Sequence, residues 1–417
     1  MARLLVDKSP PLRGTVRISG SKNSVLPILA ATLLAEEKSI IEEIPRLQDV
    51  SIMQALLESV GAKTYWNENT MEINVNTLTQ YEAPYELVRQ MRASFLIMGP
   101  LLARLGRTRI PLPGGCAIGS RPVDLHLKGF AALGAEITQE RGYVQAKADK
   151  LIGAKVYLDF PSVGATENIM MAGVLAEGQT VIENAAVEPE VVDLANYLNA
   201  MGALIRGAGT DTIKIVGVPS LRGVTHSIIP DRIEAGTFMA AAAITGGDLY
   251  LENVLSIHLN PVIAKFKEAN IQVEETENGL HIFSQGDIQG TDIKTLPYPG
   301  FPTDMQAQLM SLMSIAKGNS VITETIFENR FMHVAELNRM GADIKIEGRT
   351  AIINGVPILT GTQVRASDLR AGAALILAGL IAEGTTEIQD IYHIERGYDN
   401  IEEKLRKVGA RIQRIDI

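Results

Sequence analysis

The stretch from Leu337 to Glu347, LNRMGADIKIE, decides the fold because a closely similar pattern occurs six times along the chain. Each copy joins a helical apolar pattern to Gly-Ala, or a near equivalent, and then to a short alternating strand. The copies begin at Leu56, Phe130, Tyr197, Lys265, Leu337 and Leu405. The helix-end position is glycine at 61, 134, 202, 341 and 409 and asparagine at 270, a spacing of 68 to 73 residues. Glycine and asparagine are the residues that a left-handed helix end tolerates, and a steady period over a whole chain indicates a repeat architecture.

A second motif lies roughly forty residues before each copy, where polar residues head a helix rich in small and apolar residues. The six motifs are Ser21-Lys22-Asn23, Met91-Arg92-Ala93-Ser94, Ser162-Val163-Gly164-Ala165-Thr166, Pro230-Asp231-Arg232, Pro302-Thr303-Asp304 and Ser367-Asp368-Leu369-Arg370. Serine, threonine and aspartate are ordinary N-cap residues, and a helix that is apolar almost all round is buried. We therefore predict an α/β fold of six repeats of about 70 residues. Three repeats form each of two domains, with internal helices surrounded by sheets and outer helices.

Composition narrows the class of protein. The 417 residues include 39 basic and 48 acidic side chains, a formal charge of −9, which argues against a nucleic-acid or membrane-surface partner. The first residues lack the apolar core of a signal peptide. The longest apolar stretch, Ala371 to Ala382, is too short to span about 30 Å of hydrocarbon. A single cysteine suits a reducing compartment, so we expect a soluble cytoplasmic protein without membrane insertion.

That single cysteine, Cys116, lies in IPLPGGCAIGSRP, where glycines and prolines exclude regular structure and predict a loop that reaches solvent. Arg121 is five residues away and can favour the reactive thiolate. A lone thiol forms no intrachain disulfide, so its chemistry is nucleophilic or acid–base. The alternative is a free thiol in a glycine-rich turn.

Cations recur at the predicted helix heads. Buried helix N-termini present free N–H groups and partial positive charge, which suits an anion. The basic side chains at or near these heads are Lys22, Arg92, Arg232 and Arg370. Three further cations are expected to open the outer helices, namely Arg121, Arg330 and Arg396. On an acidic protein this pattern predicts a cationic cleft between the two domains for phosphate and carboxylate groups. For any one of them, a surface arginine without a partner is the alternative.

Several motifs together resemble one family over essentially the whole chain. GSKNSVLPILAA, MRASFLIMGPL, LPGGCAIGSRPVDLH, SVGATENIM, FPTDMQAQ, ENRFMHVAEL and DLRAGAAL are similar to the UDP-N-acetylglucosamine 1-carboxyvinyltransferases. The resemblance implies transfer of the enolpyruvyl group of phosphoenolpyruvate to the 3′-hydroxyl of UDP-N-acetylglucosamine, the first committed step of peptidoglycan precursor synthesis. It also implies a two-domain inside-out α/β barrel. Residues 21–228 would form one domain, and residues 1–20 with 229–417 the other, with the active site in the cleft between them.

The resemblance also assigns roles to residues of the site. Asp304 would serve the 3′-hydroxyl, with a simple N-cap as the alternative, and Cys116 would be the acid near the phosphoenolpyruvate methylene and can form a thioketal-type adduct. Lys22, Arg121 and Arg396 would hold phosphoenolpyruvate with Arg92 nearby, and Arg330, Asp368 and Arg370 would belong to the same network. The residues implied for the sugar nucleotide are Asn23, Arg121, Pro122, Val123, Asp124, Leu125, Ser162, Val163, Gly164 and Ile326. We expect no cofactor and no metal, and we expect a phosphonate epoxide to alkylate Cys116.

Two positions depart from the family pattern. Gln48 stands where a lysine is common, which affects a cationic closure contact. Phe160 stands where some members have a lysine, which affects a contact to the uridine diphosphate. The chain could therefore be the second of two copies of the enzyme, and its oligomeric state is left open. Three rival functions are a transferase like 5-enolpyruvylshikimate-3-phosphate synthase, an idle sugar-nucleotide-binding regulator and a structural repeat scaffold. Cys116 argues against the first, Cys116 and Asp304 argue against the second, and the buried cations argue against the third.

Overall fold

The computed structural model describes residues 2–113, 123–284 and 287–416, which fold into two compact units. The central unit runs from Gly20 to Ile229, and the terminal unit comprises the chain before Gly20 together with the chain from Pro230 onward. Each unit has its own hydrophobic core. Cys116, Arg121 and Pro122 lie outside the described residues.

Three small sheets form the outer layer of the central unit. Their strand orders are β13 (Thr225–Ser227)-β3 (Ser39–Glu42)-β5 (Thr70–Asn74)-β4 (Lys63–Asn67), β11 (Leu204–Arg206)-β12 (Thr212–Val216)-β10 (Gln179–Glu183)-β9 (Lys155–Tyr157) and β6 (Arg107–Pro111)-β8 (Tyr143–Lys147)-β7 (Glu136–Glu140). Each of the first two sheets combines one parallel pair, at one edge, with two antiparallel pairs. The third sheet has a single parallel bridge, Glu82 to Arg109, where the others have a fourth strand.

The terminal unit repeats this plan in three four-stranded sheets. Their orders are β21 (Gln363–Arg365)-β22 (Thr385–Gln389)-β1 (Arg3–Asp7)-β23 (Arg411–Ile415), β15 (Gln272–Thr276)-β16 (Gly279–Phe283)-β14 (Asp248–Glu252)-β2 (Arg13–Arg17) and β17 (Ile293–Lys294)-β18 (Asn319–Thr323)-β20 (Thr350–Asn354)-β19 (Asp343–Glu347). Each sheet again combines one parallel pair with two antiparallel pairs. The described residues thus form one sheet per predicted repeat, and the predicted six-repeat architecture is confirmed.

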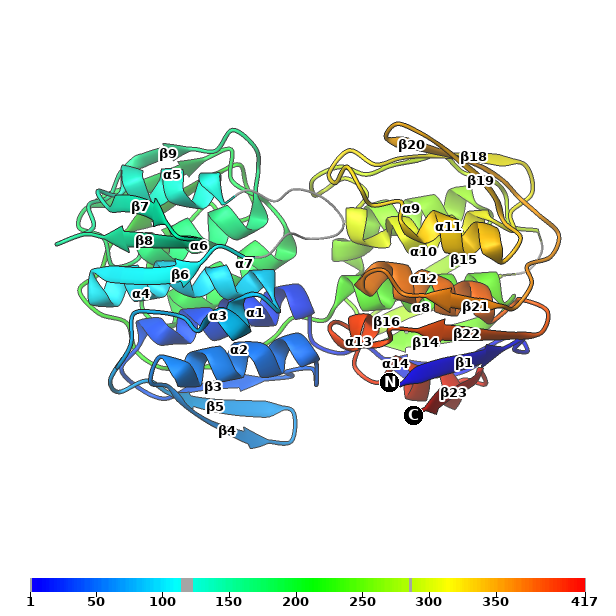
Figure 1. The fold of residues 1–417 in the computed structure, drawn as a ribbon, viewed down its shortest axis with the longest axis horizontal. Helices are drawn as coiled ribbons and strands as arrows, with labels where there is room; N and C mark the ends of the chain where they lie inside the picture. Colours follow the sequence, from blue (N-terminus) through cyan, green and yellow to red (C-terminus); the bar gives the residue numbers. More distant parts are fainter. Residues whose placement is uncertain (1, 114–122, 285–286, 417) are drawn as a thin grey trace. The chain divides into compact units, whose positions relative to one another are not determined.

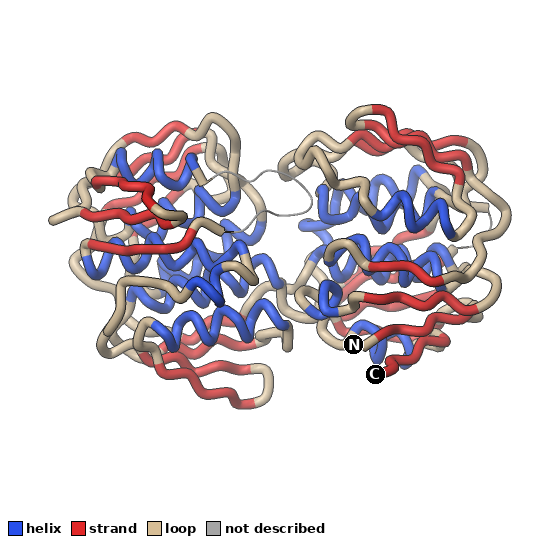
Figure 2. The backbone as a smooth tube through the Cα atoms, viewed as in Figure 1, coloured by secondary structure: helices blue, strands red, loops and turns tan. Residues whose placement is uncertain are grey.

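One interior helix belongs to each repeat, and strands surround these helices in both units (Figure 2). They are α1 (Lys22–Ala31), α4 (Met98–Leu105) and α6 (Val163–Gly173) in the central unit, and α8 (Arg232–Ile244), α10 (Gln306–Met313) and α12 (Leu369–Gly379) in the terminal unit. In α12 every residue from Arg370 to Gly379 is buried. A helix without a polar face has no side to turn to water, so the prediction of buried helices inside sheets is confirmed (Figure 1).

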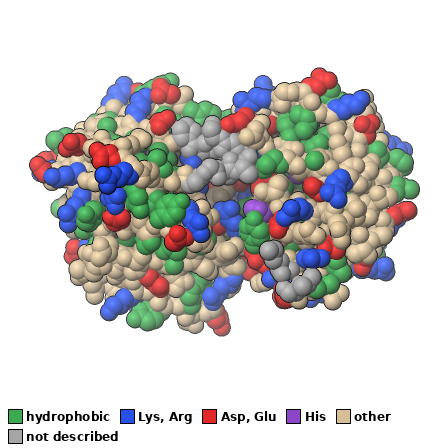
Figure 3. Space-filling model, viewed as in Figure 1, with side chains coloured by type: hydrophobic (Ala, Val, Ile, Leu, Met, Phe, Trp, Pro, Cys, Tyr) green, Lys and Arg blue, Asp and Glu red, His purple; other side chains and the backbone are tan. Residues whose placement is uncertain are grey.

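Short helices complete the described chain. They are η1 (Thr32–Leu34), α3 (Tyr85–Val88), η2 (Arg92–Ile97), η3 (Ser256–Leu259), η4 (Thr303–Met305) and α13 (Tyr392–Glu395). Two of them, η2 and η4, lead directly into α4 and α10, so these interior helices begin with a tighter turn. None of the described helices is long and apolar enough to cross a membrane. Basic and acidic side chains are interspersed on the face of each unit seen in Figure 3.

The outer helices end as the sequence predicts. They are α2 (Gln48–Ser59), α5 (Asp124–Ala132), α7 (Pro189–Ala200), α9 (Asn260–Glu268), α11 (His333–Arg339) and α14 (Ile401–Lys407). The helix-end positions 61, 134, 202, 270, 341 and 409 all have φ between 65° and 116°. The next residue then donates its N–H to the carbonyl five residues back, as from Ala135 to Phe130 at 3.0 Å. This bond closes a Schellman motif, and it recurs in all six repeats, which explains why Gly-Ala is the repeated pair.

Substitution at one helix end tests this account. Gly134 has φ +93°, and a Cβ added there would have its nearest neighbour 4.0 Å away, so only the backbone conformation penalises a side chain. Gly134→Ala should destabilise the protein by about 1–2 kcal/mol, and Gly134→Asn should lose less, because asparagine already fills the equivalent position 270. Urea unfolding measures both variants. An alanine variant that unfolds at the wild-type urea concentration would contradict the assignment.

Candidate functional site

Asp304 is the centre of a charged cluster in the terminal unit. Its carboxylate accepts from Arg330 Nη2 at 2.8 Å and from Arg370 Nη2 at 2.9 Å. The side chains of Arg330 and Arg370 are only 5% and 2% exposed, whereas that of Asp304 is 25% exposed. Three repeat elements therefore meet here, because Asp304 lies in η4, Arg370 lies in α12 and Arg330 precedes α11.

The two guanidinium groups decide the protonation of Asp304. Burial alone would raise the pKa of the carboxyl, but the charges and hydrogen bonds of Arg370 and Arg330 outweigh burial and hold this pKa well below its usual value. In the same way, burial lowers the pKa of Arg370 but Asp304 more than restores it, so the net direction is upward. Asp304 is consequently an ionised acceptor throughout the neutral range.

The N-cap alternative for Asp304 is wrong. Asp304 lies inside η4, whose N-cap residue is Pro302, and its carboxylate is turned to the two arginines. The equivalent aspartates do cap their helices, since Asp231 accepts from the backbone of α8 and Asp368 accepts from Arg370 N and Ala371 N at 2.9 and 3.0 Å. The tight first turn before α10 is what removes Asp304 from the capping position.

A second carboxylate, Glu324, orders the loop that contains Ile326. Glu324 is buried and its Oε1 accepts from Ile326 N at 2.8 Å, while its Oε2 accepts from Thr303 Oγ1 at 2.8 Å. Thr303 Oγ1 in turn accepts from Arg330 Nη1 at 3.0 Å. Ile326 is thereby tied to the Asp304 cluster. Sequence reasoning missed Glu324 and Thr303, although both flank quoted motifs.

Behind Arg370 lies a buried polar group that the sequence did not reveal. The guanidinium lies 5.4 Å from the ring centre of Tyr398, whose hydroxyl is 2.9 Å from Thr237 Oγ1. Gln308 Nε2 donates to both hydroxyls at 3.2 Å. Thr237 and Gln308 are polar positions within the buried helices α8 and α10, and that irregularity is the signal that could have identified them.

Arg396 also belongs to the terminal unit, as do the donor atoms of Arg330 and Arg370 that find no acceptor among the described residues. Arg396 does not open an outer helix; it follows the last residue of α13, where its charge adds to burial in lowering the pKa of His393.

Within the described residues, Nε and Nη1 of Arg370 and Nε of Arg330 are buried donors with no hydrogen-bond acceptor. Unpaired buried donors are costly, which favours an anionic ligand here.

The heads of the interior helices in the central unit carry the other predicted residues. Lys22 begins α1, followed by Asn23, and its Nζ lies 2.9 Å from Oδ2 of Asp49, which is buried in the first turn of α2. Gln48, next to Asp49, is exposed. Sequence reasoning missed Asp49, the partner that orients Lys22.

Helix α6 is capped by Ser162, whose hydroxyl accepts from Ala165 N at 3.4 Å, and Val163 and Gly164 form its first turn. Val123 is the N-cap of α5, and Asp124 and Leu125 follow it. Gly164 adjoins His126 of α5, so the heads of α5 and α6 lie next to each other. Arg92 acts electrostatically on the same histidine, and Phe160, just before α6, is 45% exposed.

One further cluster in the central unit was not predicted. Glu167 is buried in α6, and its Oε1 finds no hydrogen-bond partner in the described part of the chain. Burial, with the nearby charges of Glu190 and Glu188, raises the pKa of Glu167 well above its ordinary value. The folded protein therefore favours the protonated form of this carboxyl group more than the unfolded chain does.

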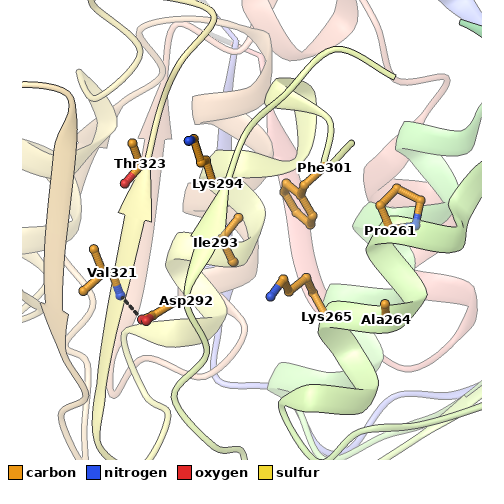
Figure 4. A pocket seen from close by; sticks show the side chains of 9 residues that line it. All are labelled: Pro261, Ala264, Lys265, Asp292, Ile293, Lys294, Phe301, Val321 and Thr323. Atoms are coloured by element: carbon orange, nitrogen blue, oxygen red, sulfur yellow. Dashed lines mark hydrogen bonds between the residues drawn. The ribbon is translucent and has the colours of Figure 1, made fainter. Parts of the chain in front are cut away.

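A cavity of about 460 Å³ opens between α9 and the β17-β18 edge, but none of the predicted site residues lines it (Figure 4). Its walls include Lys265, Lys294 and Phe301, and Asp292 accepts there from Val321 N at 2.9 Å. Lys265 is already paired with Glu268 at 2.6 Å. We do not assign this cavity as the candidate functional site, because the charged clusters around Asp304 and Lys22 lie elsewhere.

Comparison with known proteins places these features in a family. The family model of EPSP synthase (3-phosphoshikimate 1-carboxyvinyltransferase) matches residues 6–405. UDP-N-acetylglucosamine 1-carboxyvinyltransferase 1 of Caldanaerobacter subterraneus subsp. tengcongensis is 63% identical over 412 residues, 99% of both chains. UDP-N-acetylglucosamine 1-carboxyvinyltransferase 2 of Carboxydothermus hydrogenoformans is 59% identical over the full length of both chains.

Solved structures agree on the fold. The enolpyruvyl transferase NikO from Streptomyces tendae superposes with a TM-score of 0.90 at 25% identity, covering 99% of this chain and 98% of that one. EPSP synthase from Acinetobacter baumannii gives a TM-score of 0.77 at 20% identity over the full length of both chains, a likeness of fold alone. The predicted inside-out α/β architecture is confirmed.

The raised pKa of Glu167 predicts a pH-dependent stability. In the unfolded chain this carboxyl has its ordinary pKa of 4.5 and loses its proton above that pH, whereas the folded protein keeps the proton to a higher pH. The contribution of Glu167 to the free energy of unfolding therefore falls as the pH rises from 4.5 toward the raised pKa of the folded state. Glu167→Gln should therefore raise the melting temperature, more at about pH 8 than at about pH 5. The exposed Glu136→Gln is the control and should change it little at either pH. A Glu167→Gln effect of equal size at both pH values would refute the raised pKa.

Proposed function

Because the chain belongs to the UDP-N-acetylglucosamine 1-carboxyvinyltransferases of the EPSP synthase family, we propose that it transfers the enolpyruvyl group of phosphoenolpyruvate to the 3′-hydroxyl of UDP-N-acetylglucosamine. Phosphate is released, and the product enters peptidoglycan precursor synthesis. Full-length identity of 63% to a protein of that name is the observation that carries this proposal. We assign the enzyme to the cytoplasm, because its single cysteine suits a reducing compartment.

The reaction is an addition followed by an elimination. In the addition, the 3′-oxygen bonds to C2 of phosphoenolpyruvate while C3 takes up a proton, and the hydroxyl proton passes to a base. In the elimination, C3 loses a proton, the double bond re-forms, and the bond from C2 to the phosphate oxygen breaks. The site must therefore supply a base and an acid whose roles reverse between the two steps.

Asp304 is our candidate for the group that receives the 3′-hydroxyl hydrogen. It is ionised and partly exposed, so it can accept. A carboxylate between two guanidinium groups is a weak base, however, because those charges stabilise its ionised form. We infer that the incoming phosphate and carboxylate draw on Arg330 and Arg370, whose remaining buried donors favour anions. Sharing the arginines with substrate would raise the basicity of Asp304 at the moment of transfer.

The other roles follow the family resemblance. Cys116 would protonate C3 of phosphoenolpyruvate, and Lys22, Arg121 and Arg396 would hold its anionic groups. Asp49 holds the Lys22 ammonium in place from α2. The heads of α5 and α6 would bind the sugar nucleotide. The proposed reaction thus draws on both units.

Purified protein mixed with both substrates should release phosphate, and neither substrate alone should do so. Shikimate 3-phosphate in place of the sugar nucleotide should give no release. If phosphoenolpyruvate released phosphate with shikimate 3-phosphate as the acceptor but not with the sugar nucleotide, the activity would be that of a 5-enolpyruvylshikimate-3-phosphate synthase. Sugar-nucleotide binding without any release would indicate an idle regulatory relative.

Asp304→Asn tests the role of the carboxylate. We expect turnover to fall roughly a hundredfold or more, because the amide cannot take the proton. The matched control is Asp287→Asn, which breaks an exposed ion pair with Lys317 and should leave turnover unchanged. Circular dichroism should show that both variants are folded. Near-normal turnover of a folded Asp304→Asn variant would remove Asp304 from the mechanism.

A phosphonate epoxide that mimics phosphoenolpyruvate should add once to the protein at Cys116, more readily when the sugar nucleotide is present. Cys116→Asp keeps an acid and removes the sulfur nucleophile, so it should retain turnover and escape modification. Intact-mass spectrometry measures the mass added by the inhibitor to the wild-type protein and to the Cys116→Asp variant. A modified Cys116→Asp variant would locate the nucleophile elsewhere.

A further inference from the structure

Glu324 is a buried carboxylate that the proposed mechanism does not use. It directly follows β18 and is 1% exposed. Its Oε1 accepts from the backbone N–H groups of Ile326 and Phe327 at 2.8 and 3.1 Å. The hydroxyls of Thr295 and Thr303 donate to its Oε1 and Oε2 at 2.9 and 2.8 Å. Because a buried charged group needs hydrogen bonds in place of water, this carboxylate and the four groups that donate to it hold one another in position.

The hydroxyl of Thr303 has a single orientation. Arg330 Nη1 lies 3.0 Å from Thr303 Oγ1, and a guanidinium group can only donate, so the hydroxyl oxygen is the acceptor in this bond. The one hydrogen of the hydroxyl is therefore given to Glu324 Oε2. In this way the carboxylate turns a lone pair of Thr303 toward Arg330.

A second contact joins Glu324 to the same guanidinium group. The carboxylate holds the backbone N–H of Phe327, and the ring centre of Phe327 is 5.4 Å from Arg330 Cζ. A cation within about 6 Å of an aromatic ring centre is attracted to the face of the ring. The Arg330 side chain is only 5% exposed, so these contacts replace water around its charge. Glu324 thus acts on Arg330 through a hydroxyl and through an aromatic ring.

Arg330 passes this placement on to Asp304. Its Nη2 lies 2.8 Å from Asp304 Oδ1, while Arg370 holds the other carboxylate oxygen at 2.9 Å. A general base must lie within hydrogen-bond distance of the proton that it takes, and a small displacement of a reacting group slows the reaction strongly. We propose that Glu324 is a positioning residue for enolpyruvyl transfer, because it fixes the arginine that orients Asp304. The inference rests on the proposed function, in which Asp304 receives the 3′-hydroxyl hydrogen.

Thr303→Val tests the hydroxyl without changing any charge. It removes the acceptor that faces Arg330, and because Thr303 is only half-buried the variant should fold. We expect kcat to fall about tenfold, while the KM for UDP-N-acetylglucosamine stays within about threefold of wild type. Thr303→Ser keeps the hydroxyl and should retain most of the wild-type kcat.

Thr295→Val is the matched control. It removes a hydroxyl that donates to the same carboxylate, at 2.9 Å, but it leaves the bond between Arg330 and Thr303 in place. Its kcat should therefore be close to that of the wild-type protein. Circular dichroism should show that the variants are folded.

Glu324→Gln tests the carboxylate itself. An amide has one accepting oxygen and one donating NH2 group. Either the two backbone N–H groups after Glu324 or the hydroxyl of Thr303 must then lose its acceptor. We expect kcat of the folded variant to fall about as far as in Thr303→Val.

The carboxyl signal of Asp304 distinguishes positioning from a merely structural role. In carbon-13 spectra of the free protein, its titration midpoint should be higher in Thr303→Val than in wild type, because a loosely held Arg330 stabilises the ionised form less. Thr303→Ser and Thr295→Val should keep the wild-type midpoint. Burial lowers the pKa of His333, near Arg330, to about 4, and this histidine is present in every variant alike.

Wild-type kcat in a folded Thr303→Val or Glu324→Gln variant would overturn the proposal, as would an unchanged Asp304 midpoint in Thr303→Val. An equal loss of kcat in Thr295→Val would overturn it as well. None of these results affects phosphate release by the wild-type protein, so the proposed function would stand. Conversely, a wild-type protein that releases no phosphate, but whose Asp304 midpoint rises in Thr303→Val, would keep the positioning of Asp304 and lose the proposed function.

Discussion

The structure depends on one constraint, which is that six interior helices, rich in apolar and small residues on nearly every side, must be buried. Sheets and outer helices supply the cover, and the Schellman closure at Gly-Ala or Asn-Ile turns the chain back after each outer helix. The ends of such a helix are the natural place for polar groups that meet a ligand, and its first N–H groups need partners. For this reason several candidate site residues, such as Lys22, Ser162 and Arg370, lie in the segments that begin the interior helices.

In the terminal unit, the aspartate of one such segment, Asp304, does not cap a helix. Asp231 and Asp368 satisfy the backbones of α8 and α12, whereas Asp304 satisfies the side chains of Arg330 and Arg370. Two guanidinium groups are stable in the interior only beside an anion, so the cluster keeps Asp304 ionised as a condition of folding. The same arginines retain buried donors for a substrate anion. Stability and chemistry are therefore coupled at this carboxylate.

Local signals predicted the fold, whereas the contacts that were missed are long-range. The helix-end glycines and Asn270 could be predicted because the chain's own backbone requires them. The partners of Asp304 could not, since Arg370 is 66 residues away and an arginine that is 2% exposed contradicts its usual preference for the surface. Thr303 and Glu324 are 21 residues apart, and Glu167 stands in a helix that is almost wholly buried, so their surroundings follow from packing that no sequence pattern displays. The predicted roles of Lys22 and Asp304 came from family resemblance, whereas Asp49, Glu324 and Tyr398 needed the structure.

The central claim is that Arg330 and Arg370 hold Asp304 ionised in the folded protein. Carbon-13 spectra of protein labelled at the aspartate carboxyl groups test it most directly, with the Asp304 signal assigned by its loss in Asp304→Asn. We expect this signal to stay at its ionised position from about pH 7 down to about pH 4. A titration midpoint at or above the ordinary value of 3.8 would contradict the claim.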